Sequence, residues 1–368
     1  MRWGLAVMAG LGGLVLVAVA AVGTVCLSAG CAEVGYLAQS THGHFSLLAG
    51  SRPVDDWLSE PTTSEALKAR LVLAKRLREF AVTDLKLPDN RSYRSYADLR
   101  RAAAVWNVAA TPELSMKLQT WCFPVVGCIA YRGYYDQGGA QAEARALRER
   151  GLEVTVYPVP AYSTLGKMEW LGGDPLLNTF IQWPEVELSR LIFHELAHQV
   201  AYADGDTPFN ESFATAVERL GSERWLALHG SPELREQQAR LEQRRAEFRA
   251  LTQRTRAQLD AVYQSALSDD AKRSRKAELM AALRADHLAL KTGAWGGYAG
   301  YDAFFDRANN ASLAMQGAYL DLVPAFLALF EREGRDFARF FAAVQQLAGL
   351  QRAQRNATLA ALSPSPSH

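Results

Sequence analysis

Residues 191–199 read Leu-Ile-Phe-His-Glu-Leu-Ala-His-Gln, a His-Glu-x-x-His pattern in apolar, helix-favouring surroundings. Because a helix turns by about 100° per residue, His194 and His198 lie one turn apart on the same face. Two imidazoles at that spacing can bind one zinc ion, and Glu195 can reach a water molecule beside them without being a ligand. The alternative is two surface histidines on an amphipathic helix, but two unliganded imidazoles and a carboxylate in apolar surroundings would carry a desolvation cost. The stretch therefore predicts a helix with a single zinc site.

A third ligand is expected after this helix, because a hydrolytic zinc site usually has three protein ligands and an open position for water. Residues 204–206 (Asp-Gly-Asp) predict a turn, and Thr207 followed by a proline predicts the N-cap of a second helix. Glu211 falls in the first turns of that helix, with twelve residues between it and His198. Glu218, with nineteen residues between, is the rival. We prefer Glu211, and Glu218 is then a supporting or structural group.

The composition is that of a globular protein, with 368 residues, 49% of them hydrophobic and 21% charged. This apolar fraction excludes a disordered chain, and four cysteines are too few for a disulfide scaffold. With 40 basic against 39 acidic side chains, the chain lacks the surplus of Lys and Arg that binds phosphates. A nucleic-acid partner is therefore not expected.

The N-terminus predicts export. No charged residue occurs between Arg2 and Glu33, and an apolar run over residues 5–27 ends in Ser-Ala-Gly before Cys31. This order is typical of a secretory signal, and the alternative is a membrane-spanning helix. The residues before Cys31 resemble a bacterial lipobox, although Ser28 replaces the usual aliphatic residue. The resemblance implies a signal peptide over residues 1–30 and a lipid on Cys31, which anchors the mature chain to the outer membrane, in the periplasm.

Cys122 and Cys128 lie six positions apart, and Pro124 and Gly127 allow the chain to turn between them. An oxidising compartment favours pairing, so we expect a local disulfide. Two buried free thiols are the alternative. A metal role would need further Cys or His residues nearby.

Hydrophobic patterning predicts an α+β fold that is mostly helical, with a small mixed sheet. Residues 31–64 have a mixed composition and are expected to wrap the surface. A strand over residues 154–160 is expected at a sheet edge, because its prolines cannot donate to a ladder. The other expected elements are a strand over residues 126–135 and helices over residues 64–80, 93–110, 140–150 and 323–347.

A charged helical arm interrupts the core. Residues 231–290 are rich in Arg, Glu, Gln and Ala with helical periodicity, and residues 268–270 (Ser-Asp-Asp) break it. This predicts an antiparallel helical hairpin, whose interspersed charges belong to a solvated face. The expected division of the chain is a signal peptide (1–30), a metallopeptidase core (31–225), a hairpin insertion (226–295), C-terminal helices that complete the core (296–350) and a partly disordered tail (351–368).

Several stretches accompany the zinc motif: the lipobox-like leader and residues 160–166 (PAYSTLG), 209–218 (FNESFATAVE) and 309–311 (NNA). Together they resemble a family of predicted bacterial zinc aminopeptidases over most of the mature chain. The Asn-Glu pair at residues 210–211 also resembles the ligand segment of the gluzincin metallopeptidases, although it follows His198 more closely than in thermolysin-like enzymes. The resemblance implies a gluzincin-like core, one Zn²⁺ as cofactor and a peptide substrate.

The implied reaction is attack of a zinc-activated water on a peptide carbonyl. His194, His198 and Glu211 would hold the zinc, and Glu195 would act as general base and pass its proton to the leaving amine.

Two further roles follow from the resemblance. A tyrosine is expected to stabilise the oxyanion, and Tyr162 is preferred to Tyr298 and Tyr301 because it follows the edge strand. Residues 166–170 (GKMEW) partly match the Gly-x-Met-Glu-Asn motif that binds the substrate amine in some aminopeptidases, which points to Glu169. The edge strand could also hold an extended peptide by adding it to the sheet, or it could serve ordinary sheet packing.

Two other function classes stay open. One is a lipid-tethered zinc-binding or chaperone-like protein without catalysis, and the other is a zinc amidase that acts on a cell-wall bond. Glu195 argues against the first, because a structural zinc site has no need of a base.

Overall fold

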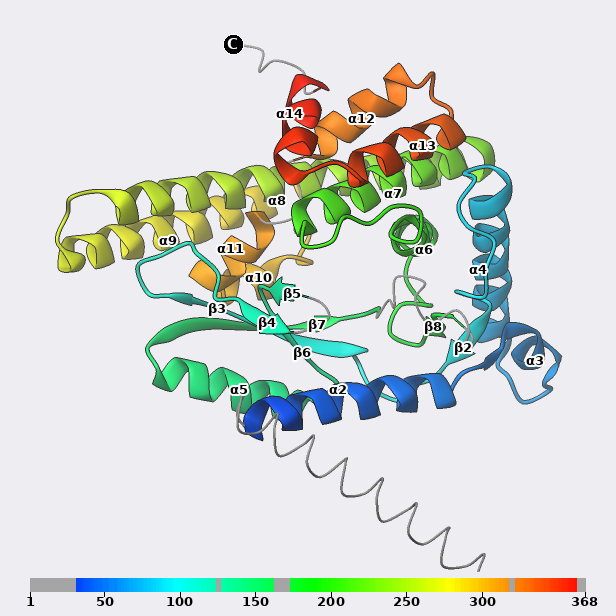
Figure 1. Ribbon diagram of the computed structural model, residues 1–368, viewed down its shortest axis with the longest axis horizontal. Helices are drawn as coiled ribbons and strands as arrows, with labels where there is room; N and C mark the ends of the chain where they lie inside the picture. Colours follow the sequence, from blue (N-terminus) through cyan, green and yellow to red (C-terminus); the bar gives the residue numbers. More distant parts are fainter. Residues whose placement is uncertain (1–30, 124–126, 162–172, 318–321, 363–368) are drawn as a thin grey trace, which may run out of the picture. The chain divides into compact units, whose positions relative to one another are not determined.

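A computed structural model of the chain describes residues 31–123, 127–161, 173–317 and 322–362 (Figure 1). Helices account for 62% of the structure and the strands form small sheets, so the expected α+β, mostly helical class is confirmed. The predicted signal peptide lies outside the described residues. Within the described ranges, no helix has both the length and the hydropathy to cross a bilayer.

The chain divides into two compact units, Met1–Gly50 and Ser51–His368. The first contains α2 (Cys31–Ala49), whose first residue is the cysteine expected to carry the lipid. The second begins with the short β1 (Arg52–Pro53) and α3 (Val54–Ser59). The part that follows the predicted signal peptide is therefore more helical than its mixed composition indicates.

The described residues of the second unit form three small sheets. In one, β3 (Val105–Pro112) pairs antiparallel with both β6 (Arg132–Tyr134) and β7 (Leu152–Val159). In another, β2 (Ser95–Ala97) pairs antiparallel with β1 and parallel with β8 (Leu176–Leu177). This second sheet is the kind of small mixed sheet that the sequence predicts.

The helix predicted over residues 93–110 is wrong, because β2 and β3 lie there. The alanines of this stretch favour a helix, whereas Val105, Trp106 and Val108 suit a strand. β3 lies between β6 and β7 and pairs with both. Pairing with partners distant in sequence therefore outweighs the local helix propensity.

β7 is an edge strand, as its proline predicts. Val154 of β7 and Val108 of β3 pack in one hydrophobic cluster with α5 (Gln137–Glu149). Tyr157 lies three positions beyond Val154 and so points to the opposite face, where its hydroxyl accepts a hydrogen bond from Asn107 Nδ2 at 3.3 Å. Figure 1 shows α5 on one side of this sheet and α11 (Asn310–Gly317) on the other.

Cys122 and Cys128 form a disulfide between β4 (Trp121–Phe123) and β5 (Gly127–Ile129). The two cysteines occupy directly paired positions of this antiparallel pair. The structure thus joins the two sulfurs as the sequence predicts, and the predicted strand that follows is divided between β5 and β6.

The motif lies on α6 (Glu185–Ala197), which packs along α7 (Thr207–His229). Gly221 of α7 allows this close approach. A Cβ at this position would lie 2.8 Å from Phe193 Cδ2 and 2.7 Å from Leu85 Cδ1, closer than atoms can pack.

The N-cap of α7 differs from the prediction. Asp206, and not Thr207, caps the helix, and its carboxylate accepts the N–H of Phe209 at 3.3 Å. A carboxylate at this position also complements the positive end of the helix dipole, which a threonine hydroxyl does not.

α8 (Pro232–Gln264) and α9 (Asp269–Thr292) form the helical hairpin that the periodicity predicts, and they lie side by side in Figure 1. Ser268 begins α9 by accepting the N–H of Ala271 at 3.3 Å. The hairpin packs on the chain that follows it, through a cluster that includes Leu259, Leu283 and Trp295. The remaining helices before the C-terminal group are α4 (Glu65–Thr83), α10 (Asp302–Asp306) and α11 (Asn310–Gly317).

The C-terminal helices cover α7. They are α12 (Val323–Arg332), α13 (Phe337–Ala348) and α14 (Arg352–Leu362), and Phe326 of α12 packs on Phe213 of α7 with ring centroids 5.7 Å apart. α14 lies in the region expected to be a partly disordered tail, and residues 363–368 lie outside the described residues.

Arg355 of α14 forms a buried ion pair with the residue that caps α7. Its Nε and Nη2 lie 3.0 and 2.6 Å from Asp206 Oδ2, and the two side chains are 5% and 3% exposed. The same guanidinium donates to the carbonyl oxygen of Leu350 at 3.0 Å. α14 therefore fixes the start of α7, near Glu211.

Replacing Arg355 with Met is expected to lower the free energy of unfolding by about 3–5 kcal/mol, because it leaves the Asp206 carboxylate buried without its cation. Urea denaturation measures the change. Arg352→Met is the matched control, since Arg352 is 63% exposed and lies 3.9 Å from the same carboxylate; it is expected to cost less than about 1 kcal/mol. Equal losses in the two variants would contradict the prediction.

Candidate metal centre

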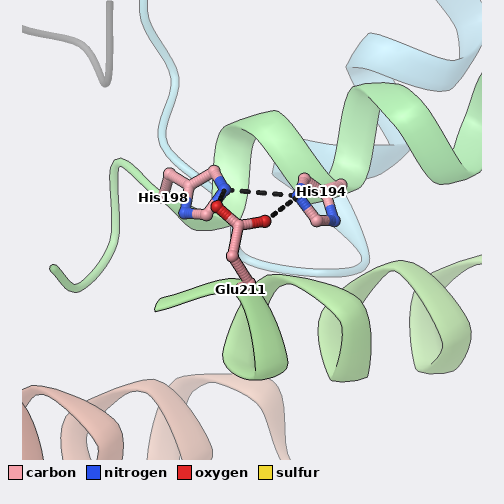
Figure 2. A group of neighbouring side chains, drawn as sticks. All are labelled: His194, His198 and Glu211. Carbon is pink, nitrogen blue, oxygen red and sulfur yellow. Dashed lines mark hydrogen bonds and ion pairs between the residues drawn. The ribbon is translucent and has the colours of Figure 1, made fainter. Parts of the chain in front are cut away.

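Three side chains from α6 and α7 converge on one point. His194 Nε2 lies 3.2 Å from His198 Nε2 and 3.4 Å from Glu211 Oε2, and His198 Nε2 lies 3.8 Å from Glu211 Oε1. Figure 2 shows Glu211 extending from α7 so that its carboxylate faces both rings. These three residues are the group within the described part of the chain whose ligand atoms lie close enough to hold one metal ion.

The separations fit a tetrahedral ion. Ligands about 2.0–2.1 Å from a tetrahedral zinc lie about 3.3–3.4 Å from one another, close to the three observed separations. A single N–H on His194 Nε2 can be donated well to one acceptor, yet both His198 and Glu211 approach this atom. The arrangement thus suits an ion with several ligands better than it suits one hydrogen bond.

The titration of these groups also favours a cation. Burial, and then the charge of His194, lower the pKa of His198 to about 4, so its imidazole is neutral at pH 7 with a lone pair to offer. Burial by itself lowers the pKa of His194, but hydrogen bonds with Glu211 and Glu218 outweigh it and hold the pKa well above its usual value. The carboxylates thus stabilise positive charge, and a divalent cation supplies positive charge.

Glu218, the rival ligand, lies on the other side of His194. Its Oε2 is 3.0 Å from His194 Nδ1, and its Oε1 accepts from Arg190 Nη2 at 2.5 Å. Burial raises the pKa of Glu218, but the hydrogen bond from His194 and the charge of Arg190 lower it to about 2. The structure therefore brings Glu211 to the two Nε2 atoms. Glu218 is placed instead where it orients the His194 ring.

An ion-pair network continues from Glu218 into the hairpin. Arg190 of α6 pairs with Glu242 of α8, and Glu242 accepts from Arg245 Nη1 at 2.7 Å. Arg245 in turn pairs with Glu187 of α6. Neither Glu242 nor Arg245 was singled out from the sequence, because both lie in a charged stretch whose pattern is typical of a solvated helix.

Glu195 lines a cavity of about 260 Å³ that His194 also lines. Leu191, one turn before Glu195 on α6, and Trp183, just before the helix, supply the apolar part of its lining, and the remaining lining residues are charged: Glu187, Arg190, Glu218 and Arg245. The expected general base and the first expected zinc ligand therefore share a space that can receive part of a substrate.

The segment after α6 is held by two other parts of the chain. Gln199, which follows His198, donates to Ser92 Oγ at 3.2 Å and accepts from Asn90. Arg78 of α4 fixes that loop, since its Nε donates to the carbonyl oxygen of Ser92 at 3.0 Å and its Nη2 to Asn90 Oδ1 at 3.1 Å. These contacts restrain the end of the motif helix where His198 lies.

Asn210 has a structural role in the Asn-Glu pair. Its Oδ1 accepts the N–H of Ala203 at 2.8 Å, and its Nδ2 donates to the carbonyl oxygen of Ala203 at 2.9 Å. These two hydrogen bonds to one residue tie the connecting segment to the first turn of α7. The position of Glu211, the next residue, is fixed in consequence.

The secondary sites expected from the sequence have different outcomes. Tyr162 and Glu169 lie outside the described residues. Tyr301 stacks on Phe248 of α8 with ring centroids 4.3 Å apart, and Tyr298 packs against the same cluster. Neither Tyr298 nor Tyr301 lines the cavity beside Glu195.

Three other tyrosines interact with residues of the candidate site. Burial, opposed by the hydrogen bond from Asn107 and assisted by the Glu211 charge, raises the pKa of Tyr157 to about 12. The pKa of Tyr93 is raised by burial and then by the charges of Glu195 and Asp174. Tyr202 packs edge-on against His198, with ring centroids 6.5 Å apart. Strand alternation places Tyr157 opposite the α5 face, but nothing in the sequence indicates what that face meets.

Comparison with known proteins places the chain in a family. Residues 35–359 match the family described as "Putative aminopeptidase". The chain belongs to this family. The match includes α6, α7 and the hairpin, so the candidate site lies within the part that defines this aminopeptidase family. No curated protein and no solved structure matches the chain.

Proposed function

We propose that this chain is a zinc-dependent aminopeptidase with a gluzincin-like core. The observation that carries the proposal is the convergence of His194 Nε2, His198 Nε2 and Glu211 at 3.2–3.8 Å from one another, with Glu195 on the wall of the adjoining cavity. Membership of the aminopeptidase family supports a peptide as substrate.

The chemistry follows from the residues. Bound zinc would supply Lewis acidity, which lowers the pKa of a water molecule to about 7 and polarises a carbonyl oxygen. Glu195 takes a proton from the attacking water as the new C–O bond forms, and delivers it to the leaving nitrogen as the C–N bond breaks. The products are a free carboxylate and a shortened peptide with a free amine.

Glu218 and the loop at Ser92 hold the ligands in place for this reaction. Glu218 accepts from His194 Nδ1, which directs Nε2 towards the zinc position. Leu191 and Trp183 provide an apolar surface for a substrate side chain, and the edge of β7 can accept an extended peptide.

The experiment that tests the proposal compares matched fluorogenic peptides with free and acetylated N-termini. The purified protein is expected to cleave the free peptides, to lose this activity with a zinc chelator and to regain it when zinc is returned. Equal cleavage of acetylated peptides would indicate an endopeptidase. Inactivity towards all peptides, with zinc bound, would favour the non-catalytic alternative or the cell-wall amidase.

Tyr157 is the proposed donor to the carbonyl oxygen, because its phenol lies on the sheet face opposite α5 and is kept protonated by burial and by the charge of Glu211. Replacing Tyr157 with Phe is expected to lower kcat about 10²-fold, the usual effect of losing one such donor. Steady-state kinetics measures it. Tyr298→Phe serves as control and is expected to leave kcat unchanged, whereas an unchanged kcat in Tyr157→Phe would assign the role elsewhere.

We also propose that the chain is exported and held in the periplasm by a lipid on Cys31, at the outer membrane. The lipobox-like residues before Cys31 and the disulfide between Cys122 and Cys128 support this location. Mass spectrometry of the protein from membrane fractions would reveal the diacylated cysteine. A soluble protein that retains residues 1–30 would contradict the proposal.

A further inference from the structure

The helical hairpin contacts the candidate metal centre through its first helix. Glu242 of α8 pairs with Arg190 of α6, and Arg190 holds Glu218, whose other oxygen binds His194 Nδ1. Three side chains thus connect the hairpin to the zinc ligand His194: Glu242 is 36% exposed, and Arg190 and Glu218 behind it are 10% and 16% exposed.

Arg190 lies between two carboxylates, with Nη2 at 2.5 Å from Glu218 Oε1 and Nη1 paired with Glu242 Oε1. Burial alone lowers the pKa of its guanidinium, and the charges of Glu218 and Glu242 outweigh burial and raise it. The Glu218 side chain is 16% exposed, and the guanidinium of Arg190 is its counter-ion. Glu242 therefore holds one side of the guanidinium whose other side is directed at Glu218.

Glu242 is itself held in place. It accepts from Arg245 Nη1 at 2.7 Å and from Gln238 Nε2 at 2.9 Å, one turn earlier on α8. Burial raises the pKa of Glu242, but the charges of Arg190 and Arg245 outweigh burial and lower it overall, so Glu242 is ionised at neutral pH. Its neighbour Arg245 bridges back to Glu187 of α6, which ties the hairpin to the motif helix at a second point.

We infer that Glu242 is a positioning residue of the metal centre, and that the hairpin is part of the site and not a separate module. Acting through Arg190 and Glu218, Glu242 fixes the orientation of the His194 ring and so raises the affinity for zinc. The inference rests on the proposed zinc site, but it does not depend on which bond the protein cleaves.

Zinc affinity of the full chain, measured by competition with a chromogenic chelator, tests this inference. Partners that hold a metal ligand typically contribute 10- to 100-fold in affinity, and Glu242 acts one step further away, so Glu242→Gln is expected to weaken zinc binding about tenfold. The matched control is Glu236→Gln, because Glu236 lies on the same helix, is 69% exposed and pairs with Arg240. The control is expected to bind zinc as the wild type does.

A double-mutant cycle separates positioning from general stability. If Glu242 acts through Glu218, then Glu242→Gln has almost no further effect on zinc affinity in a Glu218→Gln background. Glu242→Asp keeps the charge but shortens the reach, so an affinity between those of wild type and Glu242→Gln is expected, and this variant serves if the Gln variant does not fold.

Two results would overturn the inference: wild-type affinity in Glu242→Gln, or an undiminished effect of that change in the Glu218→Gln background. A different result would reject the proposed function. If the wild type binds zinc with this pattern of affinities but cleaves no peptide, the aminopeptidase proposal is rejected and the positioning role stands.

Discussion

Replacing Glu195 with Gln is expected to lower peptide hydrolysis by about 10²–10⁴-fold while zinc affinity stays close to that of the wild type. The amide keeps the shape of the side chain but cannot accept the proton of the attacking water or return it to the leaving amine. His194, His198 and Glu211 are unchanged, so the ion retains its ligands. The measurements are kcat/KM on a peptide with a free N-terminus and zinc content per protein.

Glu185→Gln is the matched control, because it makes the same change on the same helix. Glu185 Oε1 accepts the Trp225 indole N–H at 2.8 Å, and the carbonyl oxygen of Gln can keep this bond. The control is expected to retain activity. An active Glu195→Gln variant would show that another group acts as base, and a variant without zinc would show that Glu195 supports the ion as well.

Replacing Glu211 with Gln is expected to weaken zinc binding by more than about 100-fold and to abolish hydrolysis with it. Glu211 offers an anionic oxygen to the point where the two Nε2 atoms meet, and a neutral amide is a far weaker zinc ligand. Zinc affinity at neutral pH and activity at saturating zinc are the two measurements.

Glu218→Gln is the comparison that distinguishes the two glutamates. Glu218 binds His194 Nδ1 and not the Nε2 side, so its replacement is expected to cost about 10- to 100-fold in affinity, with activity recovered at high zinc. The reverse order, a larger loss for Glu218→Gln than for Glu211→Gln, would make Glu218 the ligand.

The local parts of the site could be predicted from the sequence. The spacing of His194 and His198 fixes them on one face of a helix, since the backbone geometry of a helix is independent of what surrounds it. The turn at residues 204–206 returns the chain, so an early residue of α7 had to lie near α6. The helical hairpin followed in the same way from periodicity and a break near Ser268.

Other parts could not be predicted, because they depend on partners distant in sequence. The alanines of residues 93–110 favour a helix, but β3 lies in this stretch and pairs with both β6 and β7. Tyr157 alternates with Val154 and Val156 as any strand residue would, and the effect of the Glu211 charge on its phenol depends on how the sheet packs. Glu242 lies in a stretch of alternating charge, where periodicity indicates a solvated surface.

The amino-acid sequence by itself determined the motif helix, its two histidines and neighbouring carboxylate, and the candidates for a third ligand, because these depend on spacing within a few turns of helix. Only the tertiary structure decided that Glu211 meets both imidazoles, that Glu218 and Arg190 lie behind His194, and that α8 of the hairpin reaches them. The physical reason is that ion pairs and ligand geometry depend on separations of 3–4 Å between elements, and such separations are set by side-chain packing over the whole core.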